Sequence, residues 1–185
     1  MVRDHLTVIG YEGSLPRQAM EAAALTGWTA VLQSAEVPAE GSVFVAVSSA
    51  VERSVLLQQL PTDRLVTLVH PSASVSPSAT LGLNVMVGPQ VVVAMDAVVA
   101  DGVVASSLSS IEHDNHIGHC TFLGSGAILC GGVTTGEFAF VGGGAVVQPG
   151  ISIGAHCTVG TGAVVIRDTD AHSTVVGNPA KPLST

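Results

Sequence analysis

A repeat of six residues runs without interruption from Val69 to Val165, through more than half of the chain. Every sixth residue of this stretch is Val, Ile or Leu at fifteen of seventeen positions, the exceptions being Ala105 and Thr135. An ordinary β protein alternates with a period of two between irregular turns, so a strict period of six predicts a solenoid of short stacked strands. The repeated positions, expected to point to the axis, are Val69, Val75, Leu81, Val87, Val93, Val99, Ala105, Ile111, Ile117, Leu123, Leu129, Thr135, Val141, Val147, Ile153, Val159 and Val165.

The composition agrees with such a core. Hydrophobic residues make up 47% of the chain but aromatic residues only 3%, so the core must consist of small and β-branched side chains. The net charge is -8 and Lys181 is the single lysine, so we expect neither nucleic acid nor a membrane as a partner. The N-terminal segment lacks the unbroken apolar run of a signal peptide, and we expect a cytoplasmic protein. Three cysteines, an odd number without metal-ligand spacing, favour reduced thiols.

The first 68 residues have a different pattern, in which apolar runs alternate with helical segments. Alternation of strand and helix predicts a small parallel α/β unit of Rossmann-like form. We expect strands at 5–9, 28–32, 43–47 and 65–69, and helices at 16–24 and about 50–60.

The segment Ser110–Gly118 contains the densest cluster of ionisable side chains in the repeat region. His113 and Asp114 occupy turn positions of their hexad, so neither is expected to point into the core. A neighbouring carboxylate can orient an imidazole and stabilise its charged form, which gives a general base with a partner. On these residues alone, a solvated surface histidine is the alternative. His116 and His119 follow at spacings that scatter them around a solenoid, so we expect no metal site.

Four motifs together resemble the bacterial sugar O- and N-acyltransferases, which include sialic-acid O-acetyltransferases and nucleotide-amino-sugar N-acetyltransferases. The resemblance implies a left-handed parallel β-helix in which three hexads close one triangular coil and residues eighteen apart stack. It also implies a homotrimer with active sites between subunits, and acetyl-CoA as co-substrate. The motifs are HPSASVSPSATLG at 70–82, IEHDNHIG at 111–118, GGVTTGEFAFVGGGAVV at 131–147 and VVGNPAKP at 175–182.

The resemblance also implies roles for individual residues. His113 would be the catalytic base, Asp114 its partner, and the backbone amide of Gly131 the donor to the thioester carbonyl. A glycine needed only for the shape of a corner is the alternative for Gly131. Lys181 would meet a coenzyme phosphate or remain a solvated lysine. The implied coenzyme A positions are Gly131, Gly143, Thr161, Gly177, Asn178, Pro179 and Lys181.

The chain departs from this family on the acceptor side. Many members have a second histidine nine residues after the base, where this chain has Phe122. The small glycine-rich turn that receives phosphates is replaced by Gly10-Tyr11-Glu12-Gly13-Ser14-Leu15, which is bulky and acidic. The candidate acceptor-binding residues are therefore Gly10, Tyr11, Glu12 and Phe122, and we expect nucleotide diphosphates to bind poorly.

We expect an α/β acceptor-side domain at 1–68, a left-handed parallel β-helix at 69–166, and a tail at 167–185 that completes the coenzyme A site. The predicted function is direct, metal-free transfer of an acetyl group from acetyl-CoA to a hydroxyl or amine of a sugar or another small acceptor. One alternative is a non-catalytic β-helix that serves as an assembly or ligand-binding subunit. Another is a protein like the γ-class carbonic anhydrases, although the seven histidines lack the matching spacing.

Overall fold

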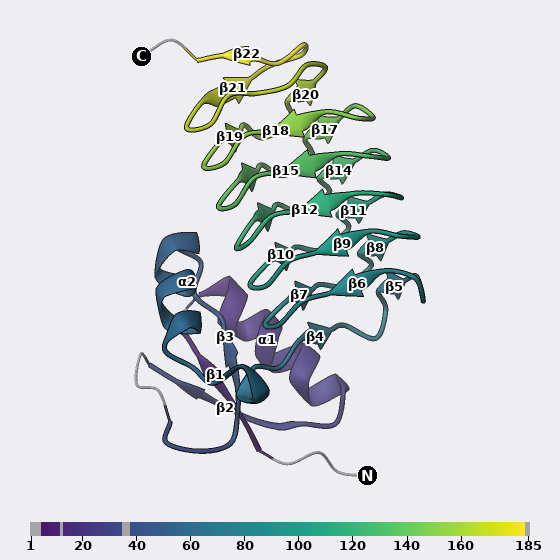
Figure 1. Cartoon of the computed structure of the whole chain (residues 1–185). Coiled ribbons are helices and arrows are strands. Elements are labelled where there is room, and N and C mark those ends of the chain that lie inside the picture. The colour runs from purple at the N-terminus through teal and green to yellow at the C-terminus, as the bar shows by residue number, and fades with distance from the viewer. Residues whose placement is uncertain (1–4, 12, 35–37, 184–185) are drawn as a thin grey trace.

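The computed structural model describes residues 5–11, 13–34 and 38–183, and shows a small α/β unit joined to a long parallel β-solenoid (Figure 1). The α/β unit lies at the N-terminal end of the solenoid, and the chain ends at the opposite end (Figure 1). Glu12, one of the expected acceptor-binding residues, lies outside the described residues. Neither helix within these ranges is long and apolar enough to cross a bilayer.

The N-terminal unit consists of three parallel strands and two helices. Its sheet has the order β2-β1-β3, so that β1 (His5–Ile9) pairs with both β2 (Thr29–Gln33) and β3 (Ser42–Val45). Helix α1 (Ser14–Leu25) connects β1 to β2, and helix α2 (Ala50–Gln58) follows β3. These five elements agree with the sequence prediction to within a few residues.

The segment expected as a fourth strand of this sheet was predicted wrongly. A 3-10 helix, η1 (Thr62–Arg64), is followed by a single bridge from Leu65 to Val43, and only β4 (Leu68–Val69) is a strand. β4 pairs with β7 (Met86–Val87) of the solenoid, because the six-residue repeat has already begun there. The Rossmann-like prediction therefore holds only as a three-stranded parallel sheet with two helices.

The six-residue repeat forms the predicted parallel solenoid. Each hexad contributes one strand of two residues, and paired strands are eighteen residues apart, as in the pairing of Ile111 with Leu129. Near the C-terminus this spacing shortens to sixteen residues, since Val159 pairs with Val175. The regular stacking of coils therefore continues beyond the end of the uninterrupted repeat.

Three sheets form the sides of the solenoid. The first contains β4, β7, β10 (Val104–Ala105), β13 (Phe122–Leu123), β16 (Phe140–Val141), β19 (Thr158–Val159), β21 (Thr174–Val176) and the antiparallel β22 (Lys181–Pro182). The second contains β5 (Ser74–Val75), β8 (Val92–Val93), β11 (Ser110–Ile111), β14 (Ile128–Leu129), β17 (Val146–Val147) and β20 (Val164–Val165). The third contains β6 (Thr80–Leu81), β9 (Val98–Val99), β12 (His116–Ile117), β15 (Thr134–Thr135) and β18 (Ser152–Ile153). The chain turns from the first to the second sheet at corner I, from the second to the third at corner II, and back to the first at corner III.

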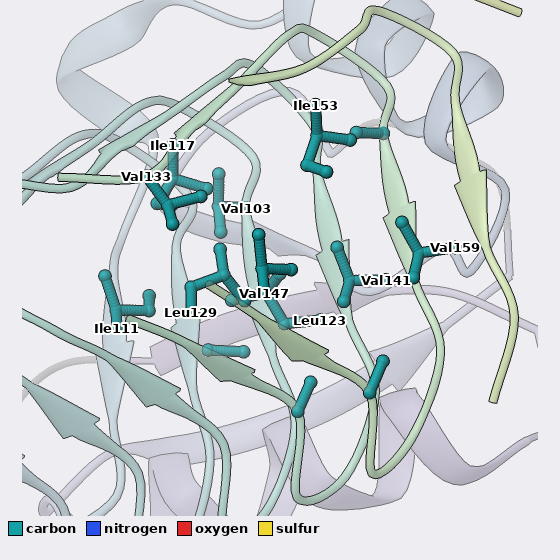
Figure 2. Close-up of a cluster of buried hydrophobic side chains, with 14 of the residues drawn as sticks. Val103, Ile111, Ile117, Leu123, Leu129, Val133, Val141, Val147, Ile153 and Val159 are labelled. Carbon is teal, nitrogen blue, oxygen red and sulfur yellow. The ribbon is translucent and has the colours of Figure 1, made fainter. Parts of the chain in front are cut away.

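The repeated apolar side chains fill the axis of the solenoid, as predicted (Figure 2). From Val87 to Val165 they are almost fully buried, and burial of each Val, Leu or Ile contributes about 1.5–3 kcal/mol. The polar exception, Thr135, also points inward, where its hydroxyl accepts a hydrogen bond from the Gly118 amide (3.0 Å). The core therefore contains no unsatisfied hydroxyl at this position.

Both helices help to attach the N-terminal unit to the solenoid. Helix α1 packs over the first sheet, in one apolar cluster with Leu68, Met86 and Val104. Helix α2 lies at corner III, where the fully buried Arg53 donates hydrogen bonds to backbone carbonyls, including those of Gly102 and Cys120 (both 2.8 Å). Burial lowers the pKa of Arg53, and the neighbouring Cys120 partly offsets this effect.

Candidate active site

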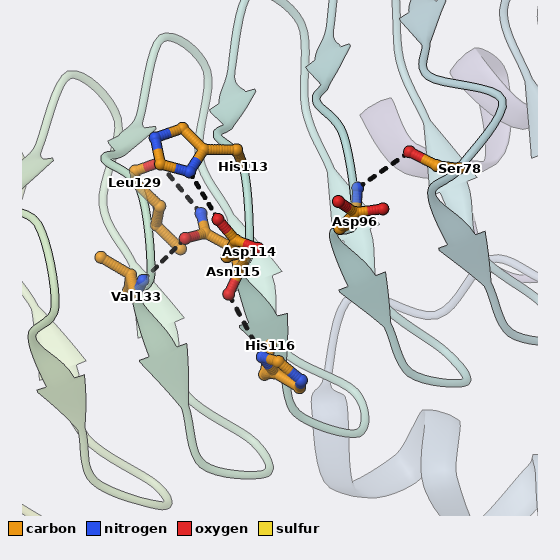
Figure 3. A network of polar contacts seen from close by, with 8 residues as sticks. All are labelled: Ser78, Asp96, His113, Asp114, Asn115, His116, Leu129 and Val133. Atoms are coloured by element: carbon orange, nitrogen blue, oxygen red, sulfur yellow. Dashed lines mark hydrogen bonds and ion pairs between the residues drawn. The ribbon is translucent and has the colours of Figure 1, made fainter.

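His113 and Asp114 lie at corner II, on the turn between β11 and β12 (Figure 3). The Nδ1 atom of His113 is 2.7 Å from Oδ2 of Asp114. A carboxylate can only accept a hydrogen bond, so in the neutral imidazole Nδ1 carries the proton and Nε2 has the free lone pair. The two side chains are 58% and 63% exposed, so the pair is open to solvent in a single chain.

Buried polar contacts hold the corner that carries this pair. Asp114 has a φ of 59°, in the left-handed region that Asp tolerates better than most residues. The next side chain, Asn115, is fully buried, donates to the Leu129 carbonyl (3.0 Å) and accepts from the Val133 amide (2.7 Å) (Figure 3). Both partners belong to the next coil, so these hydrogen bonds anchor the turn that carries His113 to that coil.

Gly131 lies one coil beyond His113 at the same corner. A Cβ atom at Gly131 would overlap Cε1 and Nε2 of the His113 ring. The left-handed backbone conformation occurs at Gly132 (φ 70°), not at Gly131, so the shape of the corner gives no reason for glycine at position 131. The amide N–H of Gly131 donates to no acceptor in the part of the chain that the structure describes. Nε2 of the histidine thus lies against Gly131, a residue whose backbone donor is free.

Two of the other expected coenzyme residues, Gly143 and Thr161, lie at corner I, on the opposite edge of the second sheet. Gly143 and Thr161 occupy the same place in successive coils, between β16 and β17 and between β19 and β20. The Val164 amide donates to the Gly177 carbonyl (3.0 Å), which ties the C-terminal turn to this corner. That turn comprises Gly177, Asn178 and Pro179. In a single chain Gly143 and Thr161 are separated from His113 by the width of the second sheet.

Arg167 was not identified from the sequence, although its position contains a signal. It lies at corner II after β20, fifty-four residues or three coils beyond His113. Three coil spacings correspond to about 14 Å along the solenoid. Arg167 and Lys181, two of the six basic residues of the chain, line the same cavity, and this arrangement suits a phosphate group. The cavity between them, of about 110 Å³, is lined by Ile166, Arg167, Pro179, Ala180 and Lys181.

The expected acceptor-binding residues lie apart from His113 within one chain. Gly10 and Tyr11 follow β1 in the N-terminal unit. Phe122 is in β13 on the first sheet, where its ring stacks on that of Phe140 with 5.5 Å between centroids. The first sheet borders corners I and III, whereas His113 is at corner II. One chain therefore does not bring the base and the acceptor residues together.

Glu52 is a second residue that the sequence analysis missed. Its Oε1 accepts a hydrogen bond from the Tyr11 hydroxyl (2.8 Å), and both side chains line a cavity of about 220 Å³. This hydrogen bond and the negative charge of Glu52 raise the pKa of Tyr11. Ser49 and Glu52 have the spacing of a helix capping box, and the Ser49 hydroxyl accepts from the Glu52 amide (3.3 Å). The Ser-x-x-Glu spacing in the sequence marks the start of a helix, and it was the signal that could have drawn attention to Glu52.

Within residues 5–11, 13–34 and 38–183, no group of three His, Cys, Asp or Glu side chains is arranged to hold a metal ion.

Comparison with known proteins identifies relatives by structure. No family model and no curated protein matches the chain. PerB from Caulobacter crescentus, solved in complex with CoA and GDP-perosamine, is 32% identical over 96% of this chain and 97% of that chain, with a TM-score of 0.90. A histidine-to-alanine variant of GDP-perosamine N-acetyltransferase from the same organism is 30% identical over 97% of both chains, with a TM-score of 0.91. The acetyltransferase domain of PglB from Neisseria gonorrhoeae, in complex with acetyl coenzyme A, is 28% identical over 97% and 98%, with a TM-score of 0.89. The chain therefore belongs to the family of hexapeptide-repeat sugar acyltransferases.

Proposed function

We propose that the chain transfers an acetyl group from acetyl-CoA to a hydroxyl or amine of a sugar or another small acceptor. The observation that carries the proposal is the position of His113. Its Nδ1 is held by Asp114, and its Nε2 lies against Gly131, whose amide is free. The CoA in the PerB structure and the acetyl coenzyme A in the PglB structure support this co-substrate.

The chemistry is a direct transfer without a covalent enzyme intermediate. The acceptor oxygen or nitrogen attacks the thioester carbonyl carbon while Nε2 of His113 takes its proton, and Asp114 stabilises the resulting imidazolium. The carbonyl oxygen becomes an oxyanion, to which the Gly131 amide donates a hydrogen bond. The carbon–sulfur bond then breaks, and the CoA thiolate leaves with the proton from His113. The products are the acetylated acceptor and free CoA.

We further propose that the active unit is a homotrimer. The outer face of the second sheet is largely apolar and is not covered by the N-terminal helices, with Val92 and Ile128 exposed and Val146 and Val164 half-buried. If three copies turn this sheet inward, corner II of one copy meets corner I of the next. This arrangement would place the corner I residues of one subunit beside His113 of its neighbour, which a single chain does not achieve.

The same arrangement gives coenzyme A a path along the solenoid, which is expected to be left-handed. The acetyl group would lie at His113, the pantetheine would pass the small corner I residues Gly143 and Thr161, and the phosphates would reach Arg167 and Lys181. The tail at 167–185, which supplies both basic residues, would thus complete the coenzyme site. On the acceptor side, the N-terminal unit and the stacked Phe122 ring would line the approach.

Release of free thiol from acetyl-CoA, followed with a panel of amino sugars and other small alcohols and amines, tests the proposed function. We expect thiol release with at least one acceptor and its loss in His113→Ala. The matched control is His172→Ala, because His172 is exposed, stacks on His156 and lies outside the proposed site. CoA binding without any transfer would favour the alternative of a non-catalytic ligand-binding subunit.

A further inference from the structure

A cavity lies at the end of the N-terminal sheet where parallel α/β folds bind their ligands. The chain leaves the central strand β1 through α1 toward β2 on one side, while β3 lies on the other (Figure 1). The crevice at the carboxyl ends of β1 and β3 is therefore the topological switch point of the sheet. The cavity of about 220 Å³ at this point is lined by Tyr11, Gly13, Pro16, Ala46, Val47, Ser48, Ser49 and Glu52.

The start of α1 is poorly suited to bind a phosphate at this crevice. Phosphates bind helix N-termini through the free amides of the first turn. Here the third helical residue is Pro16, which has no amide hydrogen and whose ring lines the cavity. A Cβ at Gly10 would come within 2.8 Å of both the Pro16 ring and the Ala46 carbonyl oxygen, so the backbone turn is already closely packed. Proline thus removes one donor and occupies part of the space that a phosphate needs.

The charge of the cavity also opposes an anion. Glu52 is the acidic residue in the first turn of α2, and its carboxylate is held in place by the Tyr11 hydroxyl. None of the residues that line this cavity is basic. Two cations lie near the cavity without lining it. Arg17 donates from Nε to the Gly13 carbonyl (3.2 Å) and lines an adjoining cavity of about 480 Å³, which shares Gly13 and Pro16 with the smaller one. The buried Arg53, which follows Glu52, donates its hydrogen bonds to backbone carbonyls, among them those of Val47 (2.6 Å) and Ser48 (3.3 Å). An anion in the smaller cavity would therefore meet a fixed carboxylate.

We infer that the Tyr11–Glu52 pair determines acceptor specificity, excluding nucleotide diphosphates and receiving the non-reacting end of an uncharged or cationic acceptor such as a free amino sugar. A carboxylate accepts hydrogen bonds from sugar hydroxyls or an ammonium group, whereas it repels phosphate. The inference rests on the proposed function, since the cavity selects an acceptor only if acetyl transfer takes place. It separates this chain from PerB, whose structure contains GDP-perosamine.

Calorimetric titration with GDP and with UDP tests the inference independently of catalysis. The variants are Glu52→Gln, which removes the charge, and Tyr11→Phe, which leaves it in place. Glu21→Gln is the matched control, because Glu21 is an exposed carboxylate of α1 outside the cavity. Titration with CoA in the same samples, together with thermal unfolding, establishes that each variant is folded and retains its coenzyme site.

We expect no binding of GDP or UDP to the wild-type protein, Tyr11→Phe or Glu21→Gln at millimolar concentration. Glu52→Gln should bind both nucleotides at least about tenfold more tightly than the wild type, because one like charge has been removed. Micromolar binding of either nucleotide to the wild type would overturn the inference, as would equal behaviour of Glu52→Gln and Glu21→Gln. Absence of acetyl transfer to every free amino sugar, with CoA bound and nucleotides still excluded, would instead count against the proposed function.

Discussion

Replacing Gly131 with alanine should displace the proposed base without unfolding the solenoid. The added methyl group would overlap the end of the His113 ring, and the ring must retreat by about 1 Å to restore ordinary van der Waals contact. The backbone at Gly131 is not left-handed, so alanine fits there, and the exposed His113 side chain can turn into solvent. We therefore expect the free energy of unfolding to change by less than about 1 kcal/mol. A displacement of 1 Å at a reacting group can lower turnover by about 10²-fold.

Turnover is measured by thiol release from acetyl-CoA, and stability by urea unfolding. The decisive control is Gly131→Ala in a His113→Ala background, where the ring is absent and the methyl group should cause no further loss of activity. Gly132→Ala provides the contrast, because its φ of 70° should make the change destabilising by about 1 kcal/mol. The reasoning is refuted if Gly131→Ala keeps more than half of the wild-type turnover, or if its loss of activity merely follows a loss of folded protein.

Four further results are expected. His113→Ala should lower turnover by about 10²–10⁴ while CoA still binds in calorimetry, and retention of more than half of the activity would remove His113 from the mechanism. Ile128→Asp should convert the proposed trimer to monomers in sedimentation, because a carboxylate would be buried in an apolar interface; a wild-type monomer at micromolar concentration would contradict the trimer. Arg53→Met should lower the free energy of unfolding by about 3–5 kcal/mol, since several buried carbonyls lose their donor; a loss below about 1 kcal/mol would be inconsistent with this. Alkylation at pH 8 should modify the partly exposed Cys130 before Cys120, because Cys120 is buried and its burial raises the pKa of its thiol. Bound CoA should protect Cys130, which is next to Gly131.

The solenoid could be predicted closely because the residues that determine it lie within each hexad. Each hexad contributes its own inward residue, as Leu123 and Leu129 do, and stacking repeats the same contact in every coil. A repeat pattern of this kind does not show where the number of residues per coil changes. The step of sixteen residues from Val159 to Val175 was therefore not predicted. Its determinants lie in a loop where the apolar repeat has already ended.

The joint between the two parts of the chain could not be predicted, because it depends on contacts between distant segments. Arg53 donates to the carbonyls of Gly102 and Cys120, forty-nine and sixty-seven residues away. An arginine on an amphipathic helix gives no sign from sequence alone that it will be fully buried. Backbone carbonyls leave no sequence pattern, so nothing marks them as partners.

The candidate site shows the same contrast between local and distant determinants. His113 and Asp114 are adjacent in sequence, and Gly131 follows at the stacking distance, so their proximity could be predicted from the repeat. Glu52 reaches Tyr11 across forty-one residues, and only the packing of α2 beside the end of β1 brings the two together.

This separation also bears on how the enzyme would acquire a new acceptor. The proposed base and oxyanion donor depend on the coil spacing and on the buried Asn115, which bonds to the next coil. The Tyr11–Glu52 pair lies on the N-terminal unit and shares none of these contacts. Substitutions there can change charge and shape at the acceptor cavity while corner II keeps its geometry. An acceptor different from the nucleotide sugar of PerB is therefore compatible with the mechanism proposed for His113.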